Sequence, residues 1–171
     1  MILFDELGLA EQSKTKPLKV LHSKLEYDGK KDGTCFIGIS NYSLDAAKVN
    51  RALSLSVPNL EDKLDQLKIT AESIVKSISD DIDNNNLIFL GVVTKIPLII
   101  VGKPGTGKSL SSQLIYNSMR GEYSKNPFFK NYPKIDQIYF QGSKNTNPED
   151  VEELFKKSEE LSNVYKKDND K

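Results

Sequence analysis

The sequence predicts an α/β fold in which helices cover both faces of a parallel five-stranded sheet. Short apolar segments alternate with segments of helical periodicity along the 171 residues, which is typical of three-layer α/β proteins. The apolar segments are continuous rather than alternating in polarity, as in strands buried on both faces. In addition, a glycine-rich loop joins one of these strands to a helix. The length is sufficient for one domain with a buried core.

Five segments are predicted to be strands because each is short, apolar and bounded by polar or turn-forming residues. In chain order these segments are Ile2–Phe4, Cys35–Ser40, Leu53–Val57, Leu98–Val101 and Ile135–Phe140.

Amphipathic patterns between these strands predict the helices. One helix covers residues 59–82, with Asn59 placed to cap its first turn. A second covers residues 109–119, and a third begins at Asn147-Pro148. His22 lies in a short amphipathic helix, where a packed or surface histidine is expected rather than a catalytic one.

The glycine-rich loop is the strongest functional signal in the chain. It follows the strand Leu98–Val101 and precedes a helix, the context that a Walker A phosphate-binding loop requires. Its backbone N–H groups and the helix N-terminus would bind phosphate oxygens. Lys108 would reach the β and γ phosphates, and the Ser109 hydroxyl would ligate Mg²⁺. The alternative is a glycine turn before a buried helix. The predicted cofactors are therefore ATP and Mg²⁺, and the predicted nucleotide-binding residues are Gly102, Lys103, Pro104, Gly105, Thr106, Gly107, Lys108, Ser109 and Leu110.

Two carboxylates follow the first predicted strand, as in a Walker B element. Asp5 is placed to hold the metal together with Ser109, and Glu6 to polarise an attacking water. The alternative interpretation is a pair of solvated acidic residues at a strand end. In ordinary ATPases with this loop the Walker A element comes first, whereas here it comes second.

Several extended phrases resemble the AAA+ core of the mysterin family of giant ATPases and ubiquitin ligases. The resemblance covers most of residues 1–160. It is more specific than the Walker motifs, because the phrases around Gly8 and Asn41 are not shared by AAA+ proteins generally. The phrases are Phe4-Asp-Glu-Leu-Gly-Leu-Ala-Glu11, Pro17-Leu-Lys-Val-Leu-His22, Phe36-Ile-Gly-Ile-Ser-Asn-Tyr-Ser-Leu-Asp45, Ala47-Lys-Val-Asn-Arg51 and Ile96-Pro-Leu-Ile-Ile-Val-Gly-Lys-Pro-Gly105.

The resemblance implies two further catalytic residues. Asn41 would be the polar sensor that orients the attacking water, and Arg51 would face the γ phosphate bound by a neighbouring module. Without the resemblance, Asn41 is interpreted as a turn residue and Arg51 as a solvated cation. The implied partners are ATP, other AAA+ modules and a protein substrate.

The resemblance also implies a sheet with the family's strand order 5-1-4-3-2. In the family's numbering, the five predicted strands of this chain, taken from first to last in the sequence, correspond to strands 3, 4, 5, 1 and 2. The chain is then a circularly permuted core whose ends lie close together, or a fragment spanning two tandem modules. In either case the helical lid is missing. If the core is permuted, helix 59–82 should lie on the same face as helix 109–119.

Four segments follow from this interpretation. Residues 1–58 form the Walker B and sensor half, residues 59–86 a connecting helix and polar linker, residues 87–165 the Walker A half, and residues 166–171 a charged tail.

Composition limits the remaining possibilities. The 24 basic and 24 acidic residues balance, so no nucleic-acid partner is expected. The longest apolar stretch is too short and too interrupted for a membrane span. A single unpaired cysteine, Cys35, favours a reducing, cytoplasmic location. One cysteine and one histidine also exclude a RING-type zinc site within these 171 residues, so ubiquitin ligase activity is not expected of them.

Three functions fit these observations. The first is an AAA+ ATP-binding module whose hydrolysis is weak alone and depends on assembly. The second is a nucleotide-gated interaction module without turnover, or an inactive fragment of a larger ATPase. The third is a small-molecule kinase or GTPase, although no guanine-reading Asn-Lys-x-Asp element is present.

Overall fold

The computed structural model describes residues 1–26, 34–45, 51–57 and 85–169. Five strands form one sheet in which every neighbouring pair is parallel, in the order β3-β4-β2-β1-β5. This is the predicted order, and it confirms the α/β fold class. The strands are β1 (Ile2–Asp5), β2 (Phe36–Ser40), β3 (Leu53–Ser56), β4 (Leu98–Val101) and β5 (Ile138–Gln141).

Burial explains why the central strands have continuous apolar sequences. Every residue of β2 is buried, and so are the first three residues of β1 and of β4. The edge strands differ: β5 alternates between half-buried and exposed residues, and β3 is mostly exposed. The central strands therefore pack on both faces, as parallel strands covered by helices do.

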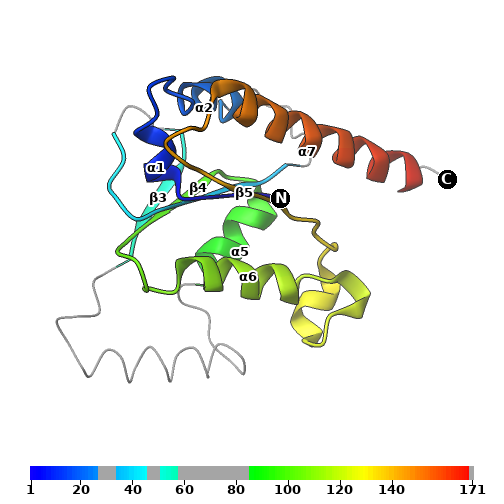
Figure 1. Ribbon diagram of the computed structural model, residues 1–171. Coiled ribbons are helices and arrows are strands. Elements are labelled where there is room, and N and C mark those ends of the chain that lie inside the picture. Colours follow the sequence, from blue (N-terminus) through cyan, green and yellow to red (C-terminus); the bar gives the residue numbers. More distant parts are fainter. Residues whose placement is uncertain (27–33, 46–50, 58–84, 170–171) are drawn as a thin grey trace, which may run out of the picture.

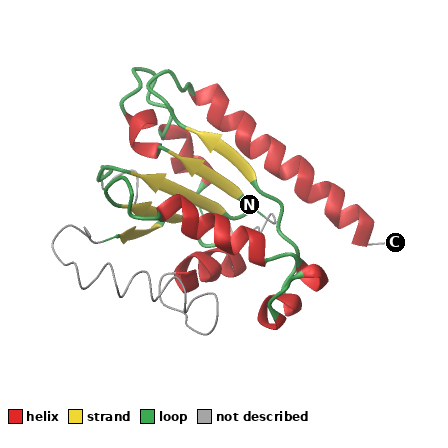
Figure 2. Ribbon diagram, turned by 60° about the horizontal axis from the view of Figure 1, so that its bottom comes forward, coloured by secondary structure: helices red, strands yellow, loops and turns green. Residues whose placement is uncertain are grey.

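Helices cover the two faces of the sheet (Figures 1 and 2). One face carries α1 (Leu7–Glu11), α2 (Lys19–Lys24) and α7 (Pro148–Asn169), whose apolar side chains join a core with Ile2 and Phe4. The other face carries α5 (Asn85–Thr94) and α6 (Lys108–Ser118), which pack against Leu3 and Ile37. Two short 3₁₀ helices, η2 (Gly121–Tyr123) and η3 (Pro127–Asn131), follow α6.

Helix α5 was not predicted, and strand β5 begins three residues later than predicted, whereas the other strand boundaries differ by at most one residue. Helix α5 begins at Asn85, inside the predicted polar linker. Strand β5 begins at Ile138 and not at Ile135, because the Ile135 N–H donates to the Met119 carbonyl at 3.2 Å, outside the sheet. The predicted helix 59–82, with the prediction about its face, lies outside the described residues.

Segments far apart in the chain meet around Asp136, at the end of the sheet where β1 begins. The Met1 amino group donates to the Asp136 carbonyl oxygen at 2.7 Å. The Tyr165 hydroxyl, near the end of α7, donates to the Asp136 carboxylate. Asp136 thus contacts both the start of β1 and the later turns of α7. None of the helices among the described residues combines the length and apolarity needed to cross a membrane.

Candidate functional site

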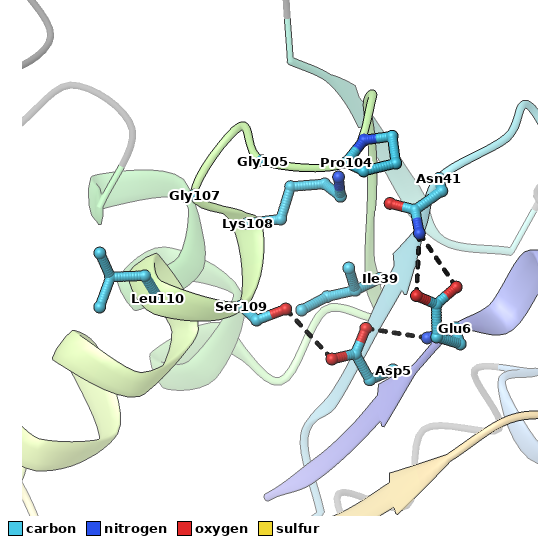
Figure 3. A pocket seen from close by; sticks show the side chains of 10 residues that line it. All are labelled: Asp5, Glu6, Ile39, Asn41, Pro104, Gly105, Gly107, Lys108, Ser109 and Leu110. Carbon is cyan, nitrogen blue, oxygen red and sulfur yellow. Dashed lines mark hydrogen bonds between the residues drawn. The ribbon is translucent and has the colours of Figure 1, made fainter.

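A cleft of about 290 Å³ lies where the carboxyl ends of the central strands meet the N-terminus of α6 (Figure 3). The carboxyl ends of parallel strands are the usual position for ligands in open α/β sheets. The cleft brings together residues from both halves of the chain. Its lining consists of Asp5, Glu6, Ile39, Asn41, Pro104, Gly105, Gly107, Lys108, Ser109 and Leu110.

The loop between β4 and α6 has the backbone of a phosphate cradle. Gly105 and Gly107 adopt φ angles of 81° and 79°, a region that costs residues with a Cβ atom about 1–2 kcal/mol. Gly107 immediately precedes α6, so the positive end of that helix faces the cleft. A Cβ atom on Gly102 would lie 3.0 Å from the Cβ of Val57. Gly102 therefore allows the loop to leave the sheet close to the end of β3.

Lys108 is buried and bound within its own loop. Its ammonium group donates to the carbonyl oxygens of Gly102 and Lys103, both at 2.7 Å, and to the Thr106 hydroxyl at 3.3 Å. Burial lowers the Lys108 pKa, while the charge of Asp5 opposes that shift. Gly102, Lys103 and Thr106 do not line the cleft themselves, and the Thr106 hydroxyl donates to the Lys103 carbonyl at 2.9 Å.

Asp5 connects the acidic strand end to the glycine loop. The Ser109 hydroxyl donates to Oδ2 of Asp5 at 3.1 Å across 104 positions of sequence. The other carboxylate oxygen, Oδ1, accepts the backbone N–H of Glu6 at 2.8 Å. Asp5 lies at the end of β1 and Ser109 in the first turn of α6. The structure thus places the two predicted metal ligands side by side.

Glu6 and Asn41 also meet in the cleft. The Asn41 amide Nδ2 donates to both carboxylate oxygens of Glu6, at 2.9 and 3.0 Å. Glu6 adopts a left-handed conformation, with φ 55°, where the chain turns from β1 into α1. Asn41 follows β2, which lies beside β1 in the sheet. Sheet pairing therefore places the amide opposite the carboxylate.

Two glycines to which the sequence analysis assigned no structural role support this acidic side. A Cβ atom on Gly8 would lie 2.8 Å from the Ser40 hydroxyl oxygen. A Cβ atom on Gly142 would lie 2.7 Å from the Glu6 carbonyl oxygen and 2.8 Å from the Phe4 ring. Both glycines let backbone segments approach closely at the strand ends. Both approaches depend on packing between elements, so no local sequence pattern marked them.

Tyr139 on β5 is a further residue of this site that sequence reasoning missed. Its hydroxyl donates to Oδ2 of Asp5 at 3.4 Å. Burial, followed by the nearby charge of Asp5, raises the Tyr139 pKa, so the hydroxyl keeps its proton and acts as a donor. Only the register of β5 against β1 reveals this contact.

Comparison with known proteins agrees with this geometry. Residues 1–63 and 78–171 match the family model described as the RNF213 AAA domain. The chain belongs to the RNF213 AAA domain family. It is an AAA+ module, and the resemblance to the mysterin family is confirmed. No solved structure matches the chain.

Three relatives of this RNF213-type AAA chain align with less than half of it. It is 43% identical to E3 ubiquitin-protein ligase RNF213 of Mus musculus over 86 residues, which is 45% of this chain and 2% of that protein. The Homo sapiens protein of the same name is 43% identical over 79 residues, which is 40% of this chain and 2% of that protein. E3 ubiquitin-protein ligase rnf213-beta of Danio rerio is 42% identical over 85 residues, which is 45% of this chain and 2% of that protein. The aligned part thus spans about 2% of the length of these relatives.

Arg51 does not line the cleft of this AAA module. It donates to the carbonyl oxygen of His22, and its guanidinium group lies 3.6 Å from the Glu26 carboxylate. The Arg51 side chain remains 39% exposed. The structure therefore brings together four of the five predicted catalytic and metal-binding residues, and it leaves Arg51 on a different surface.

The donors in the cleft suit a hard cation. Mg²⁺ takes oxygen ligands, keeps several waters and commonly uses only one or two protein groups. The Asp5 carboxylate and the Ser109 hydroxyl supply two such oxygens. Within the described ranges, no cluster of three or more His, Cys, Asp or Glu side chains forms a metal site. The residues thus fit a magnesium ion held jointly with a phosphate ligand, and they do not fit a cage made by protein alone.

Proposed function

We propose that this AAA+ module binds Mg²⁺-ATP in the cleft and hydrolyses it, weakly alone and faster on assembly. The observation that carries the proposal is the 3.1 Å contact between Ser109 and Asp5. The contact joins the glycine loop to an acidic strand end in one pocket, and phosphoryl transfer requires a phosphate-binding loop and a metal-binding carboxylate together.

On this proposal the loop binds the phosphates. The backbone N–H groups around Gly105 and Gly107 would donate to phosphate oxygens, and the dipole of α6 would favour their negative charge. Lys108 would exchange its present carbonyl acceptors for the β and γ phosphates. Asp5 and Ser109 would hold the magnesium ion, which supplies positive charge to the phosphate oxygens when bound.

The acidic side would then act on water. Glu6 would accept a proton from the attacking water, and the Asn41 amide would orient that water or the γ phosphate. Both groups line the same cleft as Lys108. Arg51 lies outside it, which supports a role toward the nucleotide of a neighbouring AAA+ module. A partner module is therefore part of the proposal. The relatives are named as ubiquitin ligases, but that activity is not proposed for this chain, which has one cysteine and one histidine.

A second candidate is an interaction module that binds nucleotide without turnover. One observation favours it: the Asn41 amide holds both oxygens of the Glu6 carboxylate. A carboxylate engaged in this way is a poorer acceptor for a water proton. Hydrolysis requires that this contact opens, whereas nucleotide binding by the loop does not.

Phosphate release distinguishes the candidates. ATP turnover and binding of a fluorescent ATP analogue would be measured for the natural sequence, Lys108→Ala and Glu6→Gln. Lys130→Ala and Glu152→Gln change exposed residues away from the cleft and serve as matched controls. Weak turnover that both cleft variants abolish supports hydrolysis. If Lys108→Ala abolishes binding of the ATP analogue but Glu6→Gln leaves phosphate release unchanged, the second candidate is supported. If Lys108→Ala retains both nucleotide binding and ATP turnover, both candidates are rejected.

A further inference from the structure

Tyr139 lies on the edge strand β5 and reaches the cleft residue Asp5. Its hydroxyl is 3.4 Å from Oδ2 of Asp5, the same oxygen that accepts the Ser109 hydroxyl at 3.1 Å. One carboxylate oxygen thus receives two hydroxyl donors, one from α6 and one from β5. The β5 donor comes from the strand that pairs with β1 at the edge of the sheet.

Strand register explains how the tyrosine reaches the carboxylate. Tyr139 pairs with Leu3, and Gln141 pairs with Asp5. Because side chains alternate between faces, Leu3, Asp5 and Tyr139 lie on one face, and Tyr139 is a diagonal neighbour of Asp5. Phe140 points to the opposite face, where its ring contacts Phe4 at a centroid distance of 4.9 Å. A diagonal separation of about 7–8 Å suits the length of a tyrosine and not that of a serine.

Core packing does not account for this side chain. Tyr139 is 55% exposed, whereas its neighbours in the apolar clusters are buried or half-buried. An exposed aromatic ring on an edge strand gains little from burial. Its polar contact with Asp5 is the feature that ties it to the cleft.

We propose that Tyr139 is a positioning residue for the metal site. By donating to Oδ2, it holds the Asp5 carboxylate facing Ser109, so the two magnesium ligands are placed before nucleotide arrives. This inference rests on the proposed function and adds a residue from β5 to it. Pre-placed ligands bind a metal more tightly because less ordering remains to be done on binding.

The test is Tyr139→Phe, which keeps the ring and removes the hydroxyl. Binding of a fluorescent ATP analogue would be titrated with Mg²⁺ and repeated in EDTA. We expect the Mg²⁺ concentration for half-maximal effect to rise about five-fold, because the hydrogen bond that is lost is a long one, at 3.4 Å. Affinity in EDTA should stay unchanged, since the phosphate loop is untouched. A purely structural role would instead weaken binding under both conditions.

Tyr123→Phe is the matched control because Tyr123 is 88% exposed and lies in η2, outside the cleft. Equal Mg²⁺ dependence in Tyr139→Phe and the natural sequence overturns the inference while leaving the proposed function intact. Absence of Mg²⁺-dependent binding in the natural sequence rejects the proposed function and, with it, the metal role of Tyr139.

A measurement without nucleotide tests the contact itself. Urea midpoints for Tyr139→Phe, Asp5→Ala and the double variant form a double-mutant cycle. A smaller shift in the double variant than the sum of the single shifts supports the contact. Additive shifts contradict it, whatever the nucleotide experiments show.

Discussion

The glycine loop and the acidic strand ends form two sides of one cleft, but different parts of the chain hold them in place. The loop is held locally, since Lys108 binds carbonyl oxygens five and six residues before it. The acidic side depends on distant partners: Glu6 meets Asn41 across 35 positions and Asp5 meets Ser109 across 104. Variants in the loop should therefore affect mainly phosphate binding, with smaller losses of stability than variants at the strand ends, which should also disturb the sheet.

The largest effect is expected from Lys108→Ala. Removing the ammonium group deletes charge-assisted hydrogen bonds to phosphate, each about 1.5–3 kcal/mol, so affinity for the fluorescent ATP analogue should fall about 100-fold. Lys130→Ala should leave affinity unchanged. Thermal unfolding of each variant would show that the protein remains folded. A loss of less than about three-fold would contradict the assignment of the loop.

The next effect contrasts two glycines on opposite sides of the cleft. Gly142→Ala should lower the free energy of unfolding by about 2 kcal/mol, because the new methyl group would overlap the Glu6 carbonyl and the Phe4 ring. Gly105→Ala should cost about 1 kcal/mol, from backbone strain alone, since no atom outside its two chain neighbours lies within 4 Å of the position that the new Cβ would take. Urea denaturation measures both. A larger loss of stability in Gly105→Ala than in Gly142→Ala would contradict the conclusion that the acidic side of the cleft is held by packing against the sheet.

Ser109→Ala tests the residue that joins the two sides. It removes one of the two protein oxygens that we propose as magnesium ligands. The Mg²⁺ concentration for half-maximal nucleotide binding should therefore rise about ten-fold. Ser111→Ala, two residues further along α6, is the control. Unchanged Mg²⁺ dependence in Ser109→Ala would show that Ser109 does not contribute to metal binding, although its hydroxyl contacts Asp5.

The smallest effect is expected from Arg51→Ala. Arg51 lies outside the cleft and forms an exposed ion pair with Glu26 at 3.6 Å. Such pairs contribute roughly 0–1 kcal/mol, so the free energy of unfolding should change by less than about 0.5 kcal/mol. Nucleotide affinity of the isolated chain should be unaltered. A clear loss of affinity would place Arg51 at its own nucleotide and not at that of a neighbour.

The contrast between local contacts in the loop and long-range contacts on the acidic side also explains which parts of the site the sequence could predict. The spacing from Gly102 to Ser109 is local, so it predicted the loop directly, and strand ends predicted that Asp5 and Ser109 would meet. The contact of Tyr139 with Asp5 depends on the register between β5 and β1, which no local pattern contains. The close approaches at Gly8 and Gly142 are likewise set by packing between elements.

Helix α5 was missed for a different physical reason. Its sequence is apolar on most sides and includes Gly91 and two adjacent valines, residues with weak helix preference. Ile88 and Val92 are buried against the sheet side, yet Leu90 and Val93 are exposed, so no polar face marked the helix. Tertiary packing against α6 and not periodicity determines this element.

The position of β4 between β2 and β3 has a consequence for how the protein is made on the ribosome. Both flanking strands, β2 and β3, precede β4 in the chain. During translation, the edges that will pair with β4 are therefore unpaired until β4 has been synthesised. Exposed strand edges of this kind favour association with other chains. Such long-range pairing is also expected to make folding slow. A nascent chain of this protein should therefore depend on chaperones until residues 98–101 have emerged.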